Sequence, residues 1–354
     1  MQYPLYRNIT ILVILFGLGA LLSACAIAEA AEDQIKQVWQ TSAHADVESV
    51  AFTRWNDNDP AVIPETCAKC HSNTGYHDFL GLDGATPGQV DQPVPVGETL
   101  ECETCHNDIT KNKHTSVMPS GIEITGLGKE NVCIDCHQGR QSTVSVNEVT
   151  AGLDEDEVNE ELSFLNIHNN AAGATQHGTE AKGGYEYEGQ EYSGLYTHAT
   201  GFETCIACHN QHTLKIDARQ CNACHVEAVD IANFKNIRVS RVDYDGDGDN
   251  TEGVKNEIET MRERLLLAIR LYAVKTKGLD NIVYEDRNPY FFDEEGEPYS
   301  TWTPRLLRAA YNYQYVVKGI GGYAHNSKYT IQLLHDSLND LGAKTSAMTR
   351  PRTN

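Results

Sequence analysis

The feature that most constrains this chain is a five-residue motif, C-x-x-C-H, which occurs five times. This motif is the attachment signature of c-type haem. Its two cysteine sulfurs form thioethers with the porphyrin, and its histidine supplies the proximal imidazole to the iron. Five motifs therefore predict five haems. The residues are, in chain order, Cys67, Cys70 and His71; Cys102, Cys105 and His106; Cys133, Cys136 and His137; Cys205, Cys208 and His209; and Cys221, Cys224 and His225.

Other uses of paired cysteines fit this pattern less well. A zinc ribbon has no need of a histidine after every second cysteine. Vicinal disulfides do not require that histidine either. Thioredoxin-like redox pairs occur singly within a βαβ pattern. The sequence therefore favours covalent haem, with zinc as the main alternative.

The charge balance restricts the partners. The 354 residues include 50 acidic and 28 basic side chains, which gives a formal net charge of −22. Nucleic acid and acidic lipid would repel such a chain, so we expect neither as a partner. A basic redox protein, or a mineral or metal-ion electron acceptor, fits the charge better. The same charge would also keep an exposed protein soluble.

The N-terminus predicts export. Ile9–Ala24 is an apolar run behind one basic residue, Arg7. The run is short for a spanning helix and suits the core of a signal peptide, which we place at residues 1–24. Export is expected in any case, because bacteria attach haem covalently outside the cytoplasmic membrane.

One cysteine, Cys25, lies outside the haem motifs. The segment Leu22–Cys25 reads L-S-A-C and resembles the bacterial lipobox, in which the cysteine is acylated and becomes the first residue. The alternative is ordinary cleavage after a small residue such as Ala28 or Ala30. We therefore expect a periplasmic or cell-surface lipoprotein, held at the membrane through Cys25.

Periodicity divides the mature chain into two regions. Residues 32–56 predict two short helices that break at Ser42–Ala45. Residues 57–202 are rich in Gly, Asn, Thr and Pro and have few long periodic segments, so we expect this part to wrap porphyrins. The predicted fold is mainly α with much irregular coil. A five-haem domain over residues 25–235 wraps a chain of haems, and a helical region follows over residues 236–354.

The helical region carries the clearest periodic patterns. We expect a long amphipathic helix over Thr251–Gly278, a second from Thr303-Pro304 to just before Gly319, and a third over Asn326–Gly342. Earlier in the chain, Gly183–Gly194 alternates tyrosine and glutamate about Glu188-Gly189. That pattern predicts an exposed β-hairpin.

Nine histidines remain after the five proximal ones, whereas the mature chain keeps only three methionines. Methionine therefore cannot ligate all five irons, and histidine can. Ligation by two histidines lowers the potential and leaves no open coordination position. We expect His335 in the core of the last helix, and His77, His114 and His177 most simply in solvated loops. The predicted distal ligands are His44, His168, His198, His212 and His325.

A second metal site is indicated by the segment D-Y-D-G-D-G-D at residues 243–249. Oxygen ligands at alternate positions with glycine at the sixth open a calcium loop. The twelfth position is Val254, so the glutamate of an EF-hand is absent, and Glu252 or Glu257 would replace it. The alternative is an acidic helix N-terminus without an ion. The predicted ligands of a structural Ca²⁺ are Asp243, Asp245, Asp247, Asp249 and Glu252.

These residues together resemble the exported bacterial multihaem, here pentahaem, c-type cytochromes. The resemblance spans most of the mature chain. Besides the five motifs it rests on S-x-H-A at Ser42–Ala45, H-T-L after the fourth motif, the D-x-D-G-D loop and Y-A-H-N at Tyr323–Asn326. A helix-borne distal histidine near the C-terminus also resembles the group that contains pentahaem nitrite reductases and octahaem hydroxylamine- or tetrathionate-type enzymes.

The sequence favours an electron carrier that passes electrons along bis-histidine haems between a donor and a periplasmic or external acceptor. The alternative is a multihaem reductase of a small oxyanion or nitrogen oxide at one open haem. The similar enzymes keep one five-coordinate haem, and in the nitrite reductases its motif is often C-x-x-C-K, whereas all five motifs here end in histidine. Extracellular cytochrome filaments are a third similar group, so a homo-oligomer or filament stays open.

Overall fold

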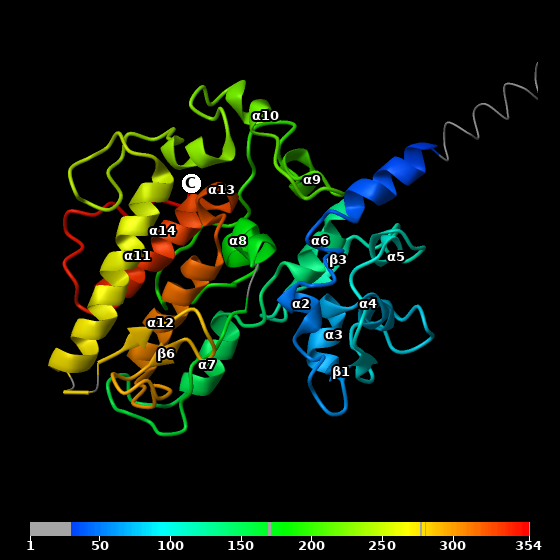
Figure 1. Cartoon of the computed structure of the whole chain (residues 1–354). Coiled ribbons are helices and arrows are strands. Elements are labelled where there is room, and N and C mark those ends of the chain that lie inside the picture. The colour runs from blue at the N-terminus through cyan, green and yellow to red at the C-terminus, as the bar shows by residue number, and fades with distance from the viewer. Residues whose placement is uncertain (1–29, 169–170, 277, 280, 354) are drawn as a thin grey trace, which may run out of the picture. The chain divides into compact units, whose positions relative to one another are not determined.

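The computed structural model describes residues 30–168, 171–276, 278–279 and 281–353 (Figure 1). The expected signal peptide at residues 1–24 and the expected lipidation site Cys25 lie outside the described residues. Among the described residues, none of the helices combines the length and apolar character that crossing a bilayer requires.

The chain forms two compact units. The N-terminal unit comprises the described residues up to Cys105 together with His209–Lys215. The C-terminal unit comprises His106–Cys208 and Ile216–Asn354. Haem motifs fall in both units, and the C-terminal helices belong to the same unit as the third motif. The boundary expected after residue 235 concerned haem binding and stays a prediction.

The predicted fold class is confirmed. Helices and irregular coil make up most of the chain, and the strands form three antiparallel pairs of two or three residues each. β1 (Val62–Ile63) pairs with β2 (Val94–Pro95). β3 (Thr115–Val117) pairs with β4 (Glu123–Thr125). β5 (Val283–Tyr284) pairs with β6 (Phe291–Phe292).

The N-terminal unit has a small apolar core. It contains helical residues 30–39 and then α2 (Val50–Thr53), α3 (Glu65–His71), α4 (Asn73–Leu80) and α5 (Cys102–Cys105). Turns separate residue 39 from α2, which confirms the predicted break. Its core cluster consists of Trp55, Ile63, Ala68 and Val94.

The sequence pattern predicts one apolar helical face formed by Val47, Val50, Ala51 and Trp55, and this prediction is partly wrong. Val47 and Val50 are 61% and 74% exposed, whereas Phe52 and Trp55 are buried. The reason is that α2 is only four residues long, so the periodicity of one continuous helix does not hold across it. Val47 and Val50 therefore remain available to an apolar group outside the polypeptide.

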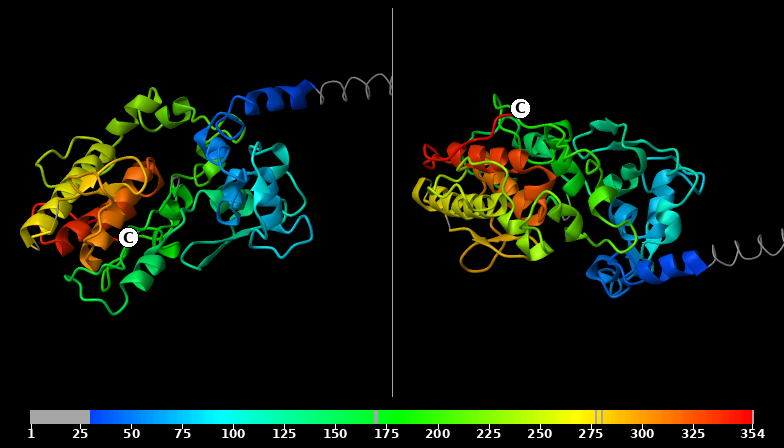
Figure 2. Two further views of the ribbon diagram at one scale, coloured as in Figure 1. Left: turned by 60° about the horizontal axis from the view of Figure 1, so that its bottom comes forward. Right: turned by 90° about the horizontal axis from the view of Figure 1, so that it is seen from above.

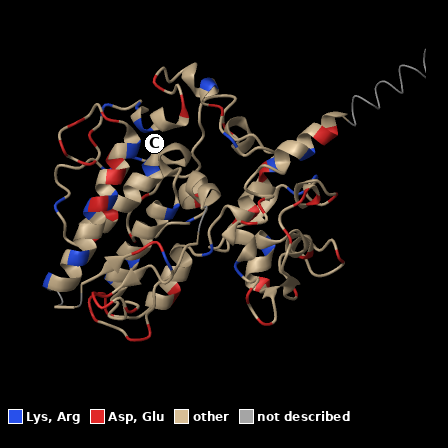
Figure 3. Cartoon of the chain, in the orientation of Figure 1, with Lys and Arg blue, Asp and Glu red and all other residues tan. Residues whose placement is uncertain are grey.

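The C-terminal unit begins with short elements that carry the haem motifs. They are η1 (Gly128–Glu130), α6 (Asn131–Cys136), α7 (Thr143–Thr150), α8 (Ala172–His177), η2 (Gly178–Glu180), α9 (Cys205–Cys208), α10 (Ala218–Asn222) and η3 (Ile231–Asn236). Acidic side chains gather on the loops of this unit, notably over residues 154–161 and 293–297 (Figure 3).

Long helices follow and lie side by side (Figures 1 and 2). α11 (Val254–Leu271) continues into a π-turn over Tyr272–Thr276, labelled η4, and precedes α12 (Pro304–Lys318), α13 (Gly322–His325) and α14 (Ser327–Asp340). The predicted second helix is confirmed at its start, because Thr303 Oγ1 accepts a hydrogen bond from Leu306 N at 3.2 Å. Each fully buried apolar side chain in such a helix contributes about 1.5–3 kcal/mol. On α11 these include Met261, Leu265 and Ile269.

The predicted exposed hairpin at Gly183–Gly194 is wrong. The turn at Glu188-Gly189 is present, and Gly189 has a φ of +77°, but no strand forms on either side. Tyr185 and Tyr192 are buried at 4% and 6% exposure. Side chains of distant helices take the place of a partner strand: Asn312 Oδ1 accepts from Tyr185 N at 2.7 Å.

Candidate haem-binding sites

Each haem motif lies on a short helical turn. α3, α5, α6 and α9 each hold both cysteines of one motif, and α10 holds the first cysteine of the fifth. Residues three apart on a helix face the same side, so both sulfurs of a motif point to one region. None of the ten motif cysteines is fully buried. The local backbone therefore fits thioether attachment to one porphyrin per motif.

The first proximal histidine has the orientation that iron ligation needs. His71 Nδ1 donates to the carbonyl oxygen of Ala51 at 2.7 Å, since a carbonyl oxygen only accepts. The ring of Trp55 meets the His71 ring edge-on, with centroids 5.2 Å apart. A proton fixed on Nδ1 places the lone pair of the ring on Nε2, the nitrogen that could ligate a metal.

The two cysteines of the second haem motif lie close to the first motif. Thr104, inside the second motif, donates through Oγ1 to Asn73 Oδ1 at 2.5 Å, and Asn73 begins the helix after His71. Glu98 supports the same contact, because its carboxylate accepts from the backbone and hydroxyl of Thr74 at 2.9 and 2.7 Å. Two haems attached here would be neighbours.

His44, a predicted distal ligand, lies beside this second motif. Its carbonyl oxygen accepts from Leu100 N at 3.1 Å, two residues before Cys102. The ring packs against Trp39 with centroids 5.7 Å apart. Burial lowers the pKa of His44 below its ordinary value, which favours the neutral imidazole that binds metals.

In the C-terminal unit, the third motif is bracketed by the segment around His168. Gly173 N donates to the His137 carbonyl at 2.8 Å, and Arg140 N donates to the Ile167 carbonyl at 2.9 Å. His168 itself has a φ of +67°, an uncommon backbone state for a non-glycine residue. The backbone thus holds His168 near the third haem motif.

The third, fourth and fifth motifs follow one another in space. The thiols of Cys133 and Cys205 are in hydrogen-bonding contact, which raises the pKa of Cys205 and lowers that of Cys133. The carboxylate of Glu130 also accepts from Cys205 N. The pKa of Cys208 is raised mainly by its burial and secondly by the negative charge of the nearby Cys221. Cysteines of neighbouring motifs therefore lie close to one another.

The imidazole rings of His198 and His225 lie close together. Their ring centroids lie 6.0 Å apart, with an interplanar angle of 56°. Histidine nitrogens bind metals at about 2 Å, so an iron between two imidazoles places their ring centres about 6 Å apart. Tyr196 and Phe202 enclose the His198 ring at 6.3 and 6.2 Å. Large apolar side chains within the fourth motif and just after the fifth are exposed: Ile206, Val226, Val229 and Ile231.

The other two predicted distal ligands are half-buried. His212 lies in the loop after the fourth motif, where its backbone N donates to Asn210 Oδ1 at 3.0 Å. His325 ends the short helix α13, which precedes α14, the helix expected over Asn326–Gly342. α13 packs against α8.

Sequence reasoning underrated one histidine. His177, expected in a solvated loop, is only 5% exposed at the end of α8, and its Nδ1 has no hydrogen bond. Burial lowers its pKa, and Glu180 at 3.6 Å opposes that shift. The one sequence signal was its place after the small-residue run A-A-G-A-T-Q, which permits close packing. His114 is exposed, as expected, whereas His77 is half-buried.

The acidic loop brings together most of its predicted ligands. Ligand atoms of Asp243, Asp245 and Asp247 lie within 4.8 Å of one another, as do those of Asp245, Glu252 and Glu257. Asp249 belongs to neither group: its Oδ1 accepts from the backbone and hydroxyl of Thr251 at 2.8 and 2.6 Å.

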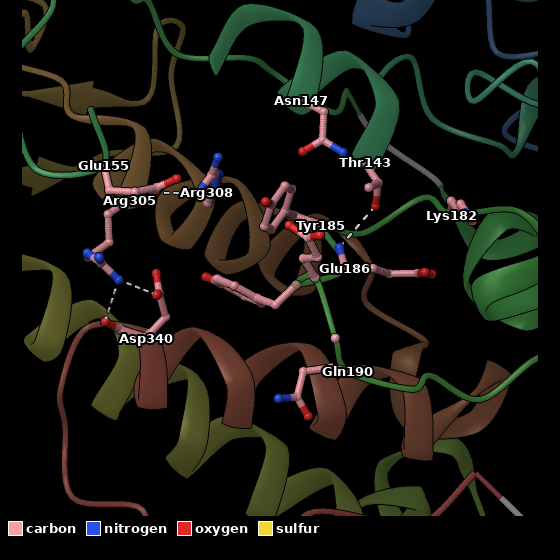
Figure 4. Close-up of a pocket in the computed structure, with 13 residues that line it drawn as sticks. Thr143, Asn147, Glu155, Lys182, Tyr185, Glu186, Gln190, Arg305, Arg308 and Asp340 are labelled. Carbon is pink, nitrogen blue, oxygen red and sulfur yellow. Dashed lines mark hydrogen bonds and ion pairs between the residues drawn. The ribbon is translucent and has the colours of Figure 1, made fainter. Parts of the chain in front are cut away.

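A polar cavity of about 680 Å³ lies elsewhere in the C-terminal unit, beside Tyr185 and Lys182 (Figure 4). Its two guanidinium groups are already neutralised, since Arg308 pairs with Glu155 and Arg305 pairs with Asp340. No residue of a haem motif lines it. The cavity is therefore lined by an ion-pair network and is separate from the haem motifs.

Comparison with known proteins agrees with this geometry. Residues 88–159 match the family described as cytochrome c7 and related cytochrome c, a stretch that includes the second and third motifs. The family match, the repeated motifs and the mainly helical fold support a multihaem c-type cytochrome as the class of this protein.

The chain is also similar to two curated relatives, each called C-type polyheme cytochrome OmcB, from Geobacter sulfurreducens strains DL-1/KN400 and ATCC 51573/DSM 12127/PCA. Identity to each is 24% over 395 aligned residues, which cover 91% of this chain and 48% of the relative. The chain thus spans about half the length of these relatives. No solved structure matches it significantly.

Proposed function

We propose that this protein transfers electrons through five covalently attached c-type haems, each ligated by histidine on both faces. The observation that carries the proposal is the separation of His198 and His225, whose rings lie 6.0 Å apart beside the fifth motif. Two imidazoles at this spacing fit one iron and leave it no open position. Electron transfer needs only that arrangement, whereas catalysis at iron needs a vacant site.

Haem supplies the one-electron redox chemistry, and the chain sets where each haem lies and what reaches it. His71 is oriented by the Ala51 carbonyl, so its Nε2 faces away from that hydrogen bond. The contact between Cys133 and Cys205 and the influence of Cys221 on Cys208 support a row of neighbouring haems in the C-terminal unit. Electrons would hop along this row.

The remaining distal ligands in the proposal are His44, His168, His212 and His325. His44 and His168 are supported by backbone contacts that place them beside the second and third motifs. A reductase with one open haem is the competing function, and His177 is a buried further candidate for an axial position.

The proposal includes export and a lipid anchor at Cys25, which would place the haems in the periplasm or at the cell surface. The relatives are named polyheme cytochromes, and that name supports an electron-transport role for this chain. The net charge of −22 favours a basic redox protein, a metal ion or a mineral as the partner.

The test is His198→Ala in the haem-loaded protein. Because Cys221, Cys224 and His225 remain, we expect five haems to stay attached while one changes from low spin to high spin. Electron paramagnetic resonance and carbon monoxide binding to the reduced protein would report the change. His114→Ala is the matched control, since His114 is an exposed histidine of the same unit.

A fully low-spin His198→Ala protein would contradict the axial pair. In the native protein, we expect every haem to be low-spin and unchanged by nitrite, cyanide or hydroxylamine. A native haem that binds one of these and turns it over would instead favour the reductase.

A further inference from the structure

We propose that Asp243, Asp245, Asp247, Glu252 and Glu257 bind one calcium ion that fixes the start of α11. This site is independent of electron transfer through the haems. It joins two groups of three carboxylates, and Asp245 belongs to both. Within each group the ligand atoms lie within 4.8 Å of one another, a spacing at which several oxygens can contact one cation.

The observation that separates this loop from an ordinary acidic surface is Asp245. Its side chain is 0% exposed, and its Oδ2 has no hydrogen-bond partner. Its Oδ1 accepts only from Asp247 N at 3.0 Å. Glu252 Oε1 is likewise buried without a partner. Buried carboxylate oxygens are rarely left unpaired, because each loses its hydration and gains nothing in return. A cation supplies the missing contact.

The charged side chains around the acidic loop also favour a bound cation. Arg238 pairs with Glu257, and both side chains are almost fully buried. Arg264 donates to the carbonyl of Asp245 rather than to a carboxylate. More carboxylates therefore meet here than the two arginines compensate.

Calcium is the cation that this donor set fits. All ligands are carboxylates, with no cysteine or histidine in either group. Calcium accepts several oxygen ligands in flexible geometry, whereas zinc prefers sulfur and nitrogen and magnesium retains water. Gly246 and Gly248 have φ values of +75° and +98°, which allow the loop to fold its oxygens inward. Glu257, on the first turn of α11, replaces the missing glutamate at Val254.

The site ties three segments together. Thr349 N donates to the Tyr244 carbonyl at 3.1 Å. A Cβ on Gly246 would lie 2.6 Å from the carbonyl carbon of Ala347, and one on Gly253 would lie 1.7 Å from the carbonyl oxygen of Lys235. The loop is thus packed between the C-terminal segment and the end of η3. Ion binding should stabilise this packing.

The experiment uses the haem-loaded protein after treatment with EGTA. Calorimetric titration with calcium chloride should give one equivalent of binding, and magnesium chloride should give much weaker binding. Glu252→Gln should weaken calcium binding at least about tenfold. This variant should fold, because the Glu252 carboxylate makes no hydrogen bond through Oε1. Asp293→Asn, in another acidic loop, is the control and should bind as wild type does.

Thermal unfolding, followed by far-ultraviolet circular dichroism, should show that calcium reverses the order of stability of wild type and Glu252→Gln. In EGTA, Glu252→Gln should be at least as stable as wild type, because it removes one charge from a repulsive cluster. In calcium, wild type should be the more stable. Absence of binding heat, equal binding of magnesium, or unchanged affinity in Glu252→Gln would each overturn the calcium site. Haem content and spin state are unaffected in every case, which keeps this test separate from electron transfer.

Discussion

The ammonium group of Lys113 lies 2.7 Å from the carboxylate of Asp135, the residue that precedes the second cysteine of the third haem motif. Asp135 is 1% exposed, and Lys113 also donates to the Thr115 carbonyl at 2.5 Å. The pair therefore ties the segment after the second motif to the interior of the third. A buried charge left without its partner is strongly destabilising.

Lys113→Met should accordingly lower the free energy of unfolding by about 3–5 kcal/mol, because it removes the cation that pairs with the buried Asp135 carboxylate. Chemical unfolding followed by far-ultraviolet circular dichroism measures the change. The matched control is Lys111→Met, whose pair with Asp108 is exposed to solvent. We expect no measurable change there. Equal stability of the two variants would show that the buried pair does not support the third motif.

A second ion pair holds the C-terminal segment against α14. Arg350 donates to both carboxylate oxygens of Asp336, with Nε and Nη2 at 2.8–3.0 Å, and to the Glu191 carbonyl at 2.7 Å. Burial alone would raise the pKa of Asp336, but hydrogen bonds from His335 and Arg350 lower it overall. A carboxyl whose pKa falls on folding stabilises the protein above its unfolded pKa.

Arg350→Met should therefore destabilise the protein at pH 7 by about 2–3 kcal/mol, an amount typical of a charge-assisted pair that is largely buried. The difference from wild type should shrink as the pH falls below about 4, where Asp336 becomes protonated. Urea unfolding at several pH values gives both quantities. Arg352→Met, an exposed neighbour, is the control. A difference that stays constant down to pH 3 would contradict the assignment.

Asn312 is the residue that replaces a partner strand for the tyrosine segment. It is 0% exposed, accepts from Tyr185 N at 2.7 Å and donates to the Tyr185 carbonyl at 2.9 Å. Asn312→Ala should cost about 3 kcal/mol, since it strands two buried backbone groups. The variant's unfolding free energy, compared with that of the exposed Asn147→Ala, measures this. A loss below that of the control would show that water reaches the segment.

The same contact explains why this part of the fold could not be predicted from sequence. The alternation of tyrosine and glutamate matched a hairpin, and a local pattern has no means of indicating that Asn312 and Tyr329, more than 120 residues away, bond to this backbone. α11, α12 and α14 were predictable because caps and periodic apolar residues lie within each helix. Thr303 bounds α12 for a local reason, because its side chain accepts a hydrogen bond from Leu306 N.

The candidate site divides in the same way. The haem-attachment motif consists of five contiguous residues, so each expected proximal histidine could be assigned from the sequence. A distal histidine is chosen by tertiary packing. The proximity of His198 to His225 and the burial of His177 therefore emerged only with the structure. Likewise, only the structure shows that Glu257, on the first turn of α11, rather than Asp249 belongs to the groups of neighbouring carboxylates in the acidic loop.

His212 gives a direct test of the distal set in the N-terminal unit. Its backbone, rather than its ring, bonds to Asn210 Oδ1, so His212→Ala leaves the loop's own hydrogen bond intact. We expect five covalent haems, one of them high-spin, by mass spectrometry and electron paramagnetic resonance. Gln211→Ala, at the adjacent exposed position, should remain low-spin throughout. Low spin at every haem of His212→Ala would show that His212 is not a ligand.

Cys221→Ala tests attachment itself. Cys221 packs against a small apolar cluster that includes Ala218, Ala228 and Phe234, and it is the first cysteine of the fifth motif. Without that sulfur the fifth haem is held only through Cys224 and the axial histidine, so we expect weakened or lost attachment. The intact mass of the mature protein measures haem stoichiometry and reports acylation of Cys25 at the same time.

Asn222→Ala is the matched control for Cys221→Ala. Asn222 occupies a variable position of the same motif, and its side chain bonds only to the Val226 carbonyl, at 3.0 Å. This variant should keep all five haems, because both sulfurs and His225 are unchanged. If Cys221→Ala retained the same haem stoichiometry as Asn222→Ala under denaturing conditions, the fifth motif would not bind haem through Cys221. The axial pair of His198 and His225 would then need another explanation.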